Sequence, residues 1–200
     1  NYMDMKITYR ELFKRIEQTA KAFLAQGVQE GDIVSILTVA SVPCVVCYYA
    51  LNKIGAVVDY INLDRNAIAN LDGVAAFTNL KWLRLNGNRL SSLPSLAALT
   101  SLRRIYLRDN AFTEVPEALR DLPSLTDIDM SGNPVAAIPD WLAKKEGLEF
   151  LSFSRTRVVK LPDDLSAWRH LKALQLGDLN LPREEMERIR RALPDVAIVF

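Results

Sequence analysis

Histidine and cysteine are scarce in this sequence of 200 residues, which contains one histidine and two cysteines. A single imidazole excludes any catalytic triad or metal centre that needs several histidines. The histidine, His170, lies in the run Trp168-Arg169-His170-Leu171 at the end of a repeated segment. This context favours a surface loop position over a catalytic base.

The two cysteines, Cys44 and Cys47, have the C-x-x-C spacing of a redox pair or of half a metal site. The sequence has no second cysteine or histidine pair that would complete a zinc site. The residues around them, from Val42 to Tyr49, are largely apolar. We therefore expect two thiols on a buried helix, with no metal and no cofactor.

Charge of one sign and long apolar runs are also missing. The 25 basic and 24 acidic side chains nearly cancel, so charge does not indicate a nucleic acid or a membrane surface as partner. No stretch approaches the roughly 18 apolar residues of a spanning helix, and Asn1 to Met5 lacks the pattern of a secretion signal. We expect a soluble protein, either cytoplasmic or produced recombinantly without a native location.

From Val58 onward the sequence repeats every 22 or 23 residues. Each copy follows L-x-x-L-x-L-x-x-N-x-L-x-x-L, where L stands for an apolar residue. Full copies begin at Val58, Leu80, Leu102 and Leu125, looser copies at Leu148 and Leu171, and a stub at Leu193, Val196 and Ile198. A fixed period of this length is typical of a solenoid.

The positions within a copy predict its structure. The L-x-x-L-x-L segment alternates apolar and polar residues, which indicates a short strand with one buried face. The asparagines that follow predict a ladder of side-chain amides bonded to neighbouring turns, at Asn66, Asn88, Asn110 and Asn133. Pairs such as Leu93-Pro94 carry the chain around the convex side. On these positions the sequence closely resembles leucine-rich repeat proteins, which implies about six repeats curving into a short horseshoe.

The pattern weakens towards the C-terminus. Thr156 and Leu179 stand where the fifth and sixth copies should carry asparagine, so we expect a weaker ladder there. The segment from Pro182 to Arg191 has acidic residues in its first turn and predicts a charged amphipathic helix. Such a helix would cap the last apolar layer of the solenoid.

The first 57 residues follow a different pattern. Thr8 and Glu11 fit a capping box, and a helical apolar stripe runs from Leu12 to Leu24 before Gly27. The apolar run at 33–37 predicts a buried parallel strand, followed by a helix from 41 to 55 and a strand at 56–61. The last three elements form a βαβ unit, which should be right-handed.

Three segments of this region, 7–12, 27–34 and 50–58, resemble the start of the adenylate-forming enzymes, the acyl-CoA synthetases and their relatives. The resemblance covers about residues 6–62 and involves scaffold residues. The phosphate-gripping loop of that family, its ATP-binding acids and its catalytic lysine have no counterpart, and no other phosphate-loop pattern replaces them. The resemblance implies one corner of a nucleotide-binding domain without the catalytic residues.

The strand at 57–63 belongs to both patterns, and no Gly-, Ser- or Pro-rich linker separates them. We therefore predict an α/β protein with one continuous parallel sheet, in which residues 1–62 form an α-β-α-β cap on the leucine-rich repeats of residues 58–200. An enzyme fragment is an unusual cap, so the sequence favours an engineered chimera of two parents. A natural fusion and a degenerate enzyme relative are the alternatives.

The polar positions of the strands predict a concave face that binds a protein. Tryptophan, tyrosine and arginine dominate its N-terminal half and are enriched at binding hot spots. The candidate residues are Tyr60, Trp82, Arg84, Arg104, Tyr106, Arg108, Asp127, Asp129 and Phe150. As an alternative, these residues only pair across neighbouring strands, Arg108 with Asp129 for example. Three arginines beside two aspartates do not supply a phosphate track for a nucleic acid.

The sequence thus predicts a monomeric chimera that has no catalytic activity and binds a protein on its concave face. Two other functions remain open at this point. One is a natural interaction module, such as the repeat domain of a bacterial effector. The other is a residual nucleotide- or acyl-binding fragment of an acyl-CoA synthetase.

Overall fold

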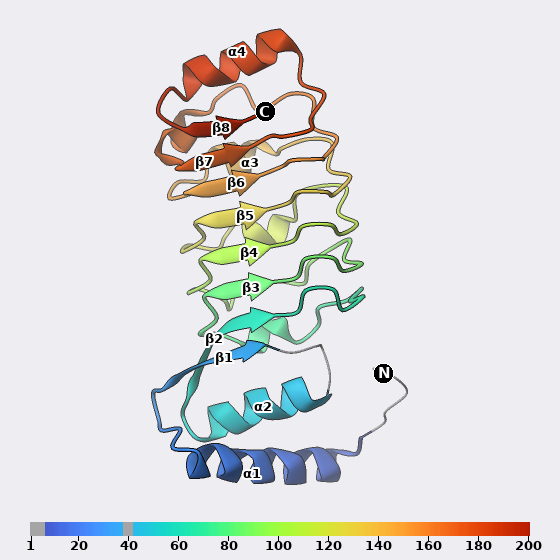
Figure 1. Cartoon of the computed structure of the whole chain (residues 1–200), viewed down its shortest axis with the longest axis vertical. Coiled ribbons are helices and arrows are strands. Elements are labelled where there is room, and N and C mark those ends of the chain that lie inside the picture. Colours follow the sequence, from blue (N-terminus) through green and yellow to red (C-terminus); the bar gives the residue numbers. More distant parts are fainter. Residues whose placement is uncertain (1–6, 38–41) are drawn as a thin grey trace.

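The computed structural model describes residues 7–37 and 42–200. Eight strands within these ranges form one parallel sheet in sequence order, from β1 to β8, as the repeat pattern and the βαβ unit predict (Figure 1). The strands are β1 (Ile33–Leu37), β2 (Val57–Asn62), β3 (Trp82–Arg84), β4 (Arg104–Tyr106), β5 (Asp127–Asp129), β6 (Phe150–Ser152), β7 (Ala173–Gln175) and β8 (Ala197–Val199). The predicted fold, one continuous parallel sheet with an α-β-α-β cap at its N-terminal end, is confirmed.

The core of the solenoid is a column of apolar side chains, one from each of the strands β2 to β7. Ile61 pairs in register with Leu83, and the same register continues through the central residues of β4 to β7. The central residues of β3 to β7 are all fully buried. Each layer buries its apolar side chains against the neighbouring layers. The period of the sequence therefore sets the order and spacing of the layers.

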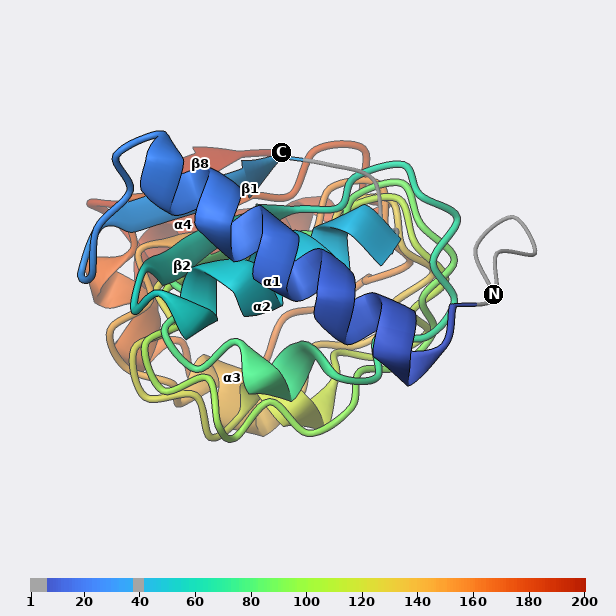
Figure 2. The same ribbon diagram turned by 90° about the horizontal axis from the view of Figure 1, so that it is seen from below.

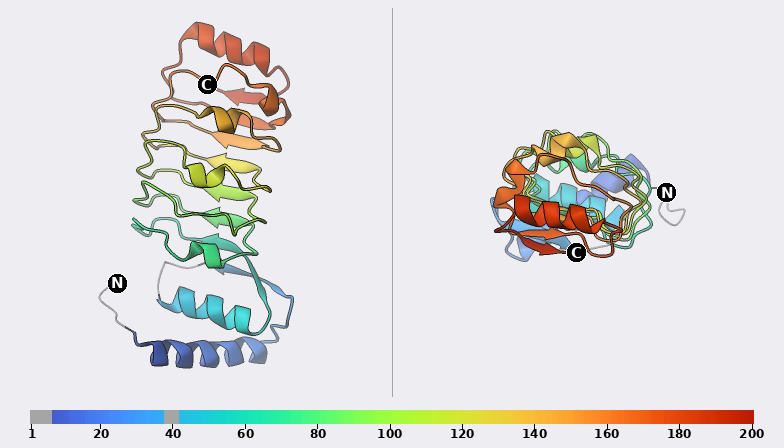
Figure 3. Two further views of the ribbon diagram at one scale, coloured as in Figure 1. Left: turned by 180° about the vertical axis from the view of Figure 1, so that it is seen from behind. Right: turned by 90° about the horizontal axis from the view of Figure 1, so that it is seen from above.

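Short turns and helices cover the convex side, where the Leu-Pro type motifs predict them (Figure 3). They are η1 (Val74–Ala76), η2 (Glu117–Leu119), α3 (Asp140–Ala143) and η3 (Ser166–His170). Pro116 and Pro139 stand at the N-caps of η2 and α3, where a missing backbone N–H costs nothing. Buried Trp168 of η3 donates its indole N–H to the Leu142 carbonyl at 2.9 Å, which joins two successive convex segments.

Two helices lie across the N-terminal end of the stack, α1 (Tyr9–Ala25) outside α2 (Val42–Lys53) (Figure 2). They pack through Ile16 and Ala20 of α1 and Val46 and Ala50 of α2. The Thr8 hydroxyl accepts the Glu11 N–H at 3.2 Å, so the predicted N-cap is present. The Glu11 carboxylate binds Arg15 at 2.8 Å, so the reciprocal half of the capping box is replaced by an ion pair within the helix.

The N-terminal unit and the repeats share one core. Strand β2 pairs with β1 on one edge and with β3 on the other. Tyr48 of α2 donates its hydroxyl to the Ala76 carbonyl in η1, and its ring lies 3.9 Å from that of Phe77 between centroids. One buried cluster therefore runs from Ile36 to Val196.

The predicted capping helix is α4 (Arg183–Ala192), which lies across the C-terminal end of the stack (Figure 3). Its buried Glu185 accepts the Leu161 N–H at 2.8 Å and two hydrogen bonds from Arg188, both at 2.8 Å. Arg188 in turn donates to the carbonyls of Leu161, Pro162 and Asp163. The cap is thus fastened to the fifth repeat by ionised hydrogen bonds as well as by apolar contact.

Two sequence predictions concern residues beyond the described ranges. These are the lack of a secretion signal in Asn1 to Met5 and the start of the second helix at Ser41. Among the helices of the described ranges, none has the length and apolar character needed to cross a membrane.

Candidate protein-binding face

The asparagine ladder fixes the turns that follow the strands. The Asn88 amide donates to the carbonyls of Leu63 and Leu85, at 2.9 and 2.8 Å, and its oxygen accepts the N–H groups of Asn66 and Ile68. Asn110 and Asn133 repeat this arrangement one and two layers further on. Each asparagine satisfies backbone groups of two layers at once, so it sets the spacing of the side chains on the concave face.

The ladder weakens where the sequence predicts it. The Thr156 hydroxyl donates only to the Phe153 carbonyl of its own turn, at 2.7 Å. It has no second donor with which to reach the preceding turn. Leu179, at the next position, is half-buried and packs against the core.

The residue before each ladder position has a left-handed backbone. Gly87 and Gly132 adopt φ values of +65° and +68°, and the same turn position is occupied by Arg65, Asp109, Arg155 and Asp178, with φ between 54° and 58°. A left-handed conformation costs a residue with a side chain about 1 kcal/mol. The recurrence of glycine at 87 and 132 is the signal in the sequence for this left-handed backbone.

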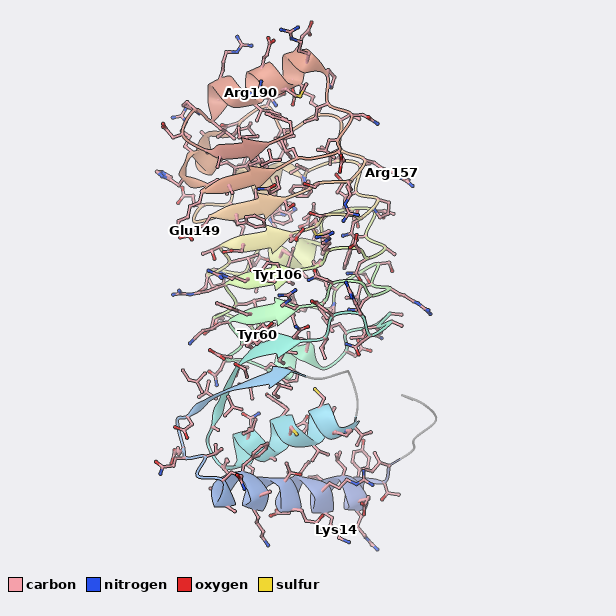
Figure 4. All side chains as sticks on the ribbon, in the orientation of Figure 1. Lys14, Tyr60, Tyr106, Glu149, Arg157 and Arg190 are labelled. Atoms are coloured by element: carbon pink, nitrogen blue, oxygen red, sulfur yellow. The ribbon has the colours of Figure 1, made fainter. Side chains whose placement is uncertain are left out.

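The strand register arranges candidate residues in two columns, to which Tyr60 and Tyr106 belong (Figure 4). One column runs through Tyr60, Trp82, Arg104, Asp127 and Phe150. The other runs through Asn62, Arg84, Tyr106 and Asp129. The register brings eight of the nine candidate residues side by side, and Arg108 lies beyond the end of its strand.

Trp82 is the most exposed aromatic residue of the face, at 41%. Its ring meets the ring of Tyr60 edge-on, with centroids 5.8 Å apart. On the other side, the Arg104 guanidinium carbon lies 4.6 Å from the centroid of the Trp82 ring. The indole is therefore accessible and at the same time held between two neighbours.

Arg84 contacts one residue in the turn after β2 and another in β4. Its guanidinium binds Asp64 at 2.9 Å and lies 5.6 Å from the centroid of the Tyr106 ring. Burial acts to lower the pKa of Arg84, but the charge and hydrogen bond of Asp64, together with Tyr60, raise that pKa overall. Burial raises the pKa of the Tyr106 hydroxyl, and the charge of Asp127 adds to this shift. The Arg84 side chain is therefore charged, and the Tyr106 phenol neutral, throughout the physiological pH range.

The acidic residues are also engaged. Arg104 reaches Asp127 at 3.5 Å, and Asp127 accepts the Thr126 hydroxyl at 2.6 Å. Asp129 accepts the backbone N–H of Ser131 at 2.9 Å. The pair of Arg104 with Asp127 crosses two neighbouring strands, as the alternative interpretation has it. Arg108 pairs with Asp109 at 3.1 Å and not with Asp129, so the example given for that interpretation is wrong.

The C-terminal half of the face carries small side chains. Phe150 is half-buried, and the next residues in the two columns are Ala173, Ser152 and Gln175. The hydroxyls of Ser131 and Ser152 are buried and lie 2.5 Å apart. The face therefore changes from bulky aromatic and basic groups to a smooth polar surface along the stack.

Three contributors to this face were not among the candidate residues. Asp64 orients Arg84, and Asp109 binds both Arg108 and Arg155. Each lies just after its strand, in the turn, where the period of the strand no longer predicts the direction of a side chain. Six ion pairs on the face and its margin involve most of its charged residues.

The cysteines and the histidine lie away from this face. Burial raises the pKa of both thiols, Cys44 and Cys47, so they are protonated at neutral pH. His170 is exposed at the end of η3. The described ranges contain no group of three or more His, Cys, Asp or Glu side chains that could hold a metal ion.

Comparison with protein families separates the two parts of the chain. Residues 57–112 and 78–135 match the leucine rich repeat family, and residues 2–68 match the AMP-binding enzyme family. The chain is thus a leucine-rich repeat solenoid whose N-terminal segment is similar to the start of an AMP-binding enzyme. The two matches overlap at residues 57–68, which contain β2. No curated protein matches the sequence significantly.

Solved structures of leucine-rich repeat proteins have a similar fold. An internalin (inlF) from Listeria monocytogenes superposes with a TM-score of 0.54 at 20% identity, over 76% of this chain and 52% of that one. The Leptospira interrogans LRR protein LIC12759 gives a TM-score of 0.42 at 19% identity, over 82% and 58%. The chain spans between half and three fifths of the length of these structures.

Proposed function

We propose that this protein is a non-enzymatic binding scaffold and that its concave face binds a partner protein around Trp82. The observation that carries the proposal is the exposed indole of Trp82, fixed between Tyr60 and Arg104. A large aromatic group that is already immobilised loses little side-chain entropy when it is covered. Such groups dominate the binding energy of protein interfaces.

Affinity capture with purified variants tests this function. Wild type and Trp82→Ala are immobilised and exposed to the same cell extract, with Val159→Ala as a matched control, because Val159 is an exposed apolar residue outside the concave columns. We expect the same captured protein with wild type and Val159→Ala, and its loss with Trp82→Ala. Equal capture by all three variants would contradict the proposal.

A residual nucleotide- or acyl-binding activity is the second candidate, because residues 2–68 match AMP-binding enzymes. The sequence has no counterpart of the phosphate-gripping loop of that family, so we expect no affinity for the nucleotide. Calorimetric titration with ATP and Mg²⁺ separates the two functions. Binding in the micromolar range would favour the second candidate over the first.

We further propose that the chain is a chimera of two parents joined at β2, engineered or recombined, and that it is a monomer. The overlap of both family matches on β2 and the absence of a linker support this origin. A genome that encodes both parts in one gene would instead support a natural interaction module. Sedimentation equilibrium tests the monomer.

A further inference from the structure

Exposed large apolar side chains are concentrated at the N-terminal end of the molecule. Nine such residues are exposed in the described ranges, and six of them belong to residues 9–49. They are Tyr9, Phe13, Leu24, Ile33, Val45 and Tyr49. The repeats account for the other three, although they make up most of the chain.

Four of these side chains share one side of the helix pair. The Glu17 carboxylate lies 2.6 Å from the Lys53 ammonium, so these two residues mark the same side of α1 and α2. On α1, Phe13 is one turn before Glu17 and Tyr9 is one turn before Phe13. On α2, Tyr49 is one turn before Lys53 and Val45 is one turn before Tyr49. We name Tyr9, Phe13, Val45 and Tyr49 the helix-pair patch.

The members of this patch are accessible to a partner. Tyr9 is 82% exposed, Phe13 64%, Tyr49 46% and Val45 42%. The ring of Tyr49 meets that of Tyr48 edge-on at 5.3 Å between centroids, and Tyr48 is itself fixed on η1. Three aromatic rings on a rigid helix pair have the composition of an interface centre, not of ordinary surface.

The charge beside the patch is positive. Arg10 and Lys14 follow Tyr9 and Phe13 in α1 and are both exposed, and Lys14 points away from the body of the molecule (Figure 4). Within the described part of the chain neither takes part in an ion pair, whereas Glu11 is bound by Arg15 and Glu17 by Lys53. The cations therefore remain available next to the aromatic groups.

From this geometry we infer that the helix-pair patch is a second binding site, which takes an acidic amphipathic segment of another protein. Apolar side chains of the segment cover the patch, and its carboxylates meet Arg10 and Lys14. A second copy of this chain fits poorly, because it would bring the same two cations to the same patch. The site is independent of the concave face, which lies on the sheet.

A designed peptide tests the inference. The probe is a fluorescein-labelled helical peptide with leucine and phenylalanine on one face and glutamate elsewhere, and its binding is followed by fluorescence anisotropy. We expect wild type to bind it, Phe13→Ser to bind about tenfold more weakly, and Arg10→Glu with Lys14→Glu to lose binding. Circular dichroism confirms that each variant is folded, since all three residues are exposed.

Matched variants elsewhere control for unspecific attraction. Val159→Ser removes an exposed apolar group and Arg103→Glu reverses an exposed charge, both away from α1 and α2, and both should bind the peptide as wild type does. Equal binding by Phe13→Ser and wild type would overturn the inference. It would also be overturned if vesicles of anionic lipid bound wild type through Phe13 while the peptide did not, or if Phe13 mediated a dimer in sedimentation.

Discussion

Asp109 and Arg155 form an ion pair that spans two repeats and passes over Gly132. The Arg155 guanidinium lies 3.0 Å from Asp109 Oδ1, although the residues are 46 positions apart. A Cβ atom on Gly132 would lie 2.1 Å from the same oxygen. The glycine between them leaves room for the Asp109 carboxylate and takes a left-handed backbone without strain.

Replacing this glycine should cost more than backbone strain alone. We expect Gly132→Ala to lower the free energy of unfolding by about 2 kcal/mol, since the left-handed conformation and the clash with Asp109 both oppose it. Gly147→Ala is the control, because Gly147 has φ of +78° but no atom within 4 Å of an added Cβ. Urea denaturation measures both, and an equal loss would show that the clash is relieved at no cost.

The ladder asparagines should be the least replaceable polar residues of the repeats. Asn133→Ala leaves the Leu107 and Met130 carbonyls and the Phe112 N–H without their partner, so we expect a loss of about 3 kcal/mol. Thr156→Asn should instead stabilise the protein by about 1 kcal/mol, because its amide would reach the preceding turn. Thermal and urea denaturation test both, and a destabilised Thr156→Asn protein would argue against a ladder at that position.

The contribution of Glu185 should depend on pH. Its pKa is lowered from the usual 4.5 by the hydrogen bonds of Arg188, against the opposing effect of burial. A lowered carboxyl pKa in the folded state stabilises the protein above pH 4.5, and this stability is lost as the pH falls through the folded pKa. Glu185→Gln should therefore be about 2 kcal/mol less stable than wild type at pH 7 and nearly equal to it at pH 2.

An exposed carboxylate provides the control for this experiment. Glu149 pairs with Lys172 at the surface, and Glu149→Gln should leave the pH dependence of stability almost unchanged. If the stability difference between Glu185→Gln and wild type stayed the same in acid, the effect would come from packing of the cap and not from the ionised carboxylate.

The junction should unfold together with the repeats. Tyr48→Phe removes the hydroxyl that binds the Ala76 carbonyl, and we expect a loss of about 1 kcal/mol. Because one buried cluster extends from Ile36 to Val196, near- and far-ultraviolet circular dichroism should show the same single transition. Two separate transitions would mean that residues 1–62 form a domain of their own.

The sequence predicts the layers of this fold better than the contacts within a layer. The period of the apolar residues sets the sheet order, and the alternation in each strand places Trp82 and Arg104 on the concave face. The stacking of Arg104 on Trp82 does not follow from that alternation, since the neighbouring Asp127 competes for the same side chain. The contact depends on rotamers and on the twist between strands, which spacing does not encode.

The turns show the same limit. The alternative interpretation paired Arg108 with Asp129 across the sheet, but the register places Tyr106 opposite Asp129, and Arg108 binds Asp109 instead. Asp109 has a φ of 54° and ends the extended backbone, so the two-residue period does not predict this contact. The glycines at 87 and 132 carried the missing information, because their recurrence at one position indicates a left-handed turn.

Strand β2 belongs both to the N-terminal α/β unit and to the first repeat. It is joined to the repeats by backbone pairing with β3 and by the buried side chains of Val58 and Ile61. We therefore expect that another α/β unit would replace residues 1–62 if its last parallel strand carried two apolar residues at this spacing. The edge of a single strand then defines where the solenoid begins.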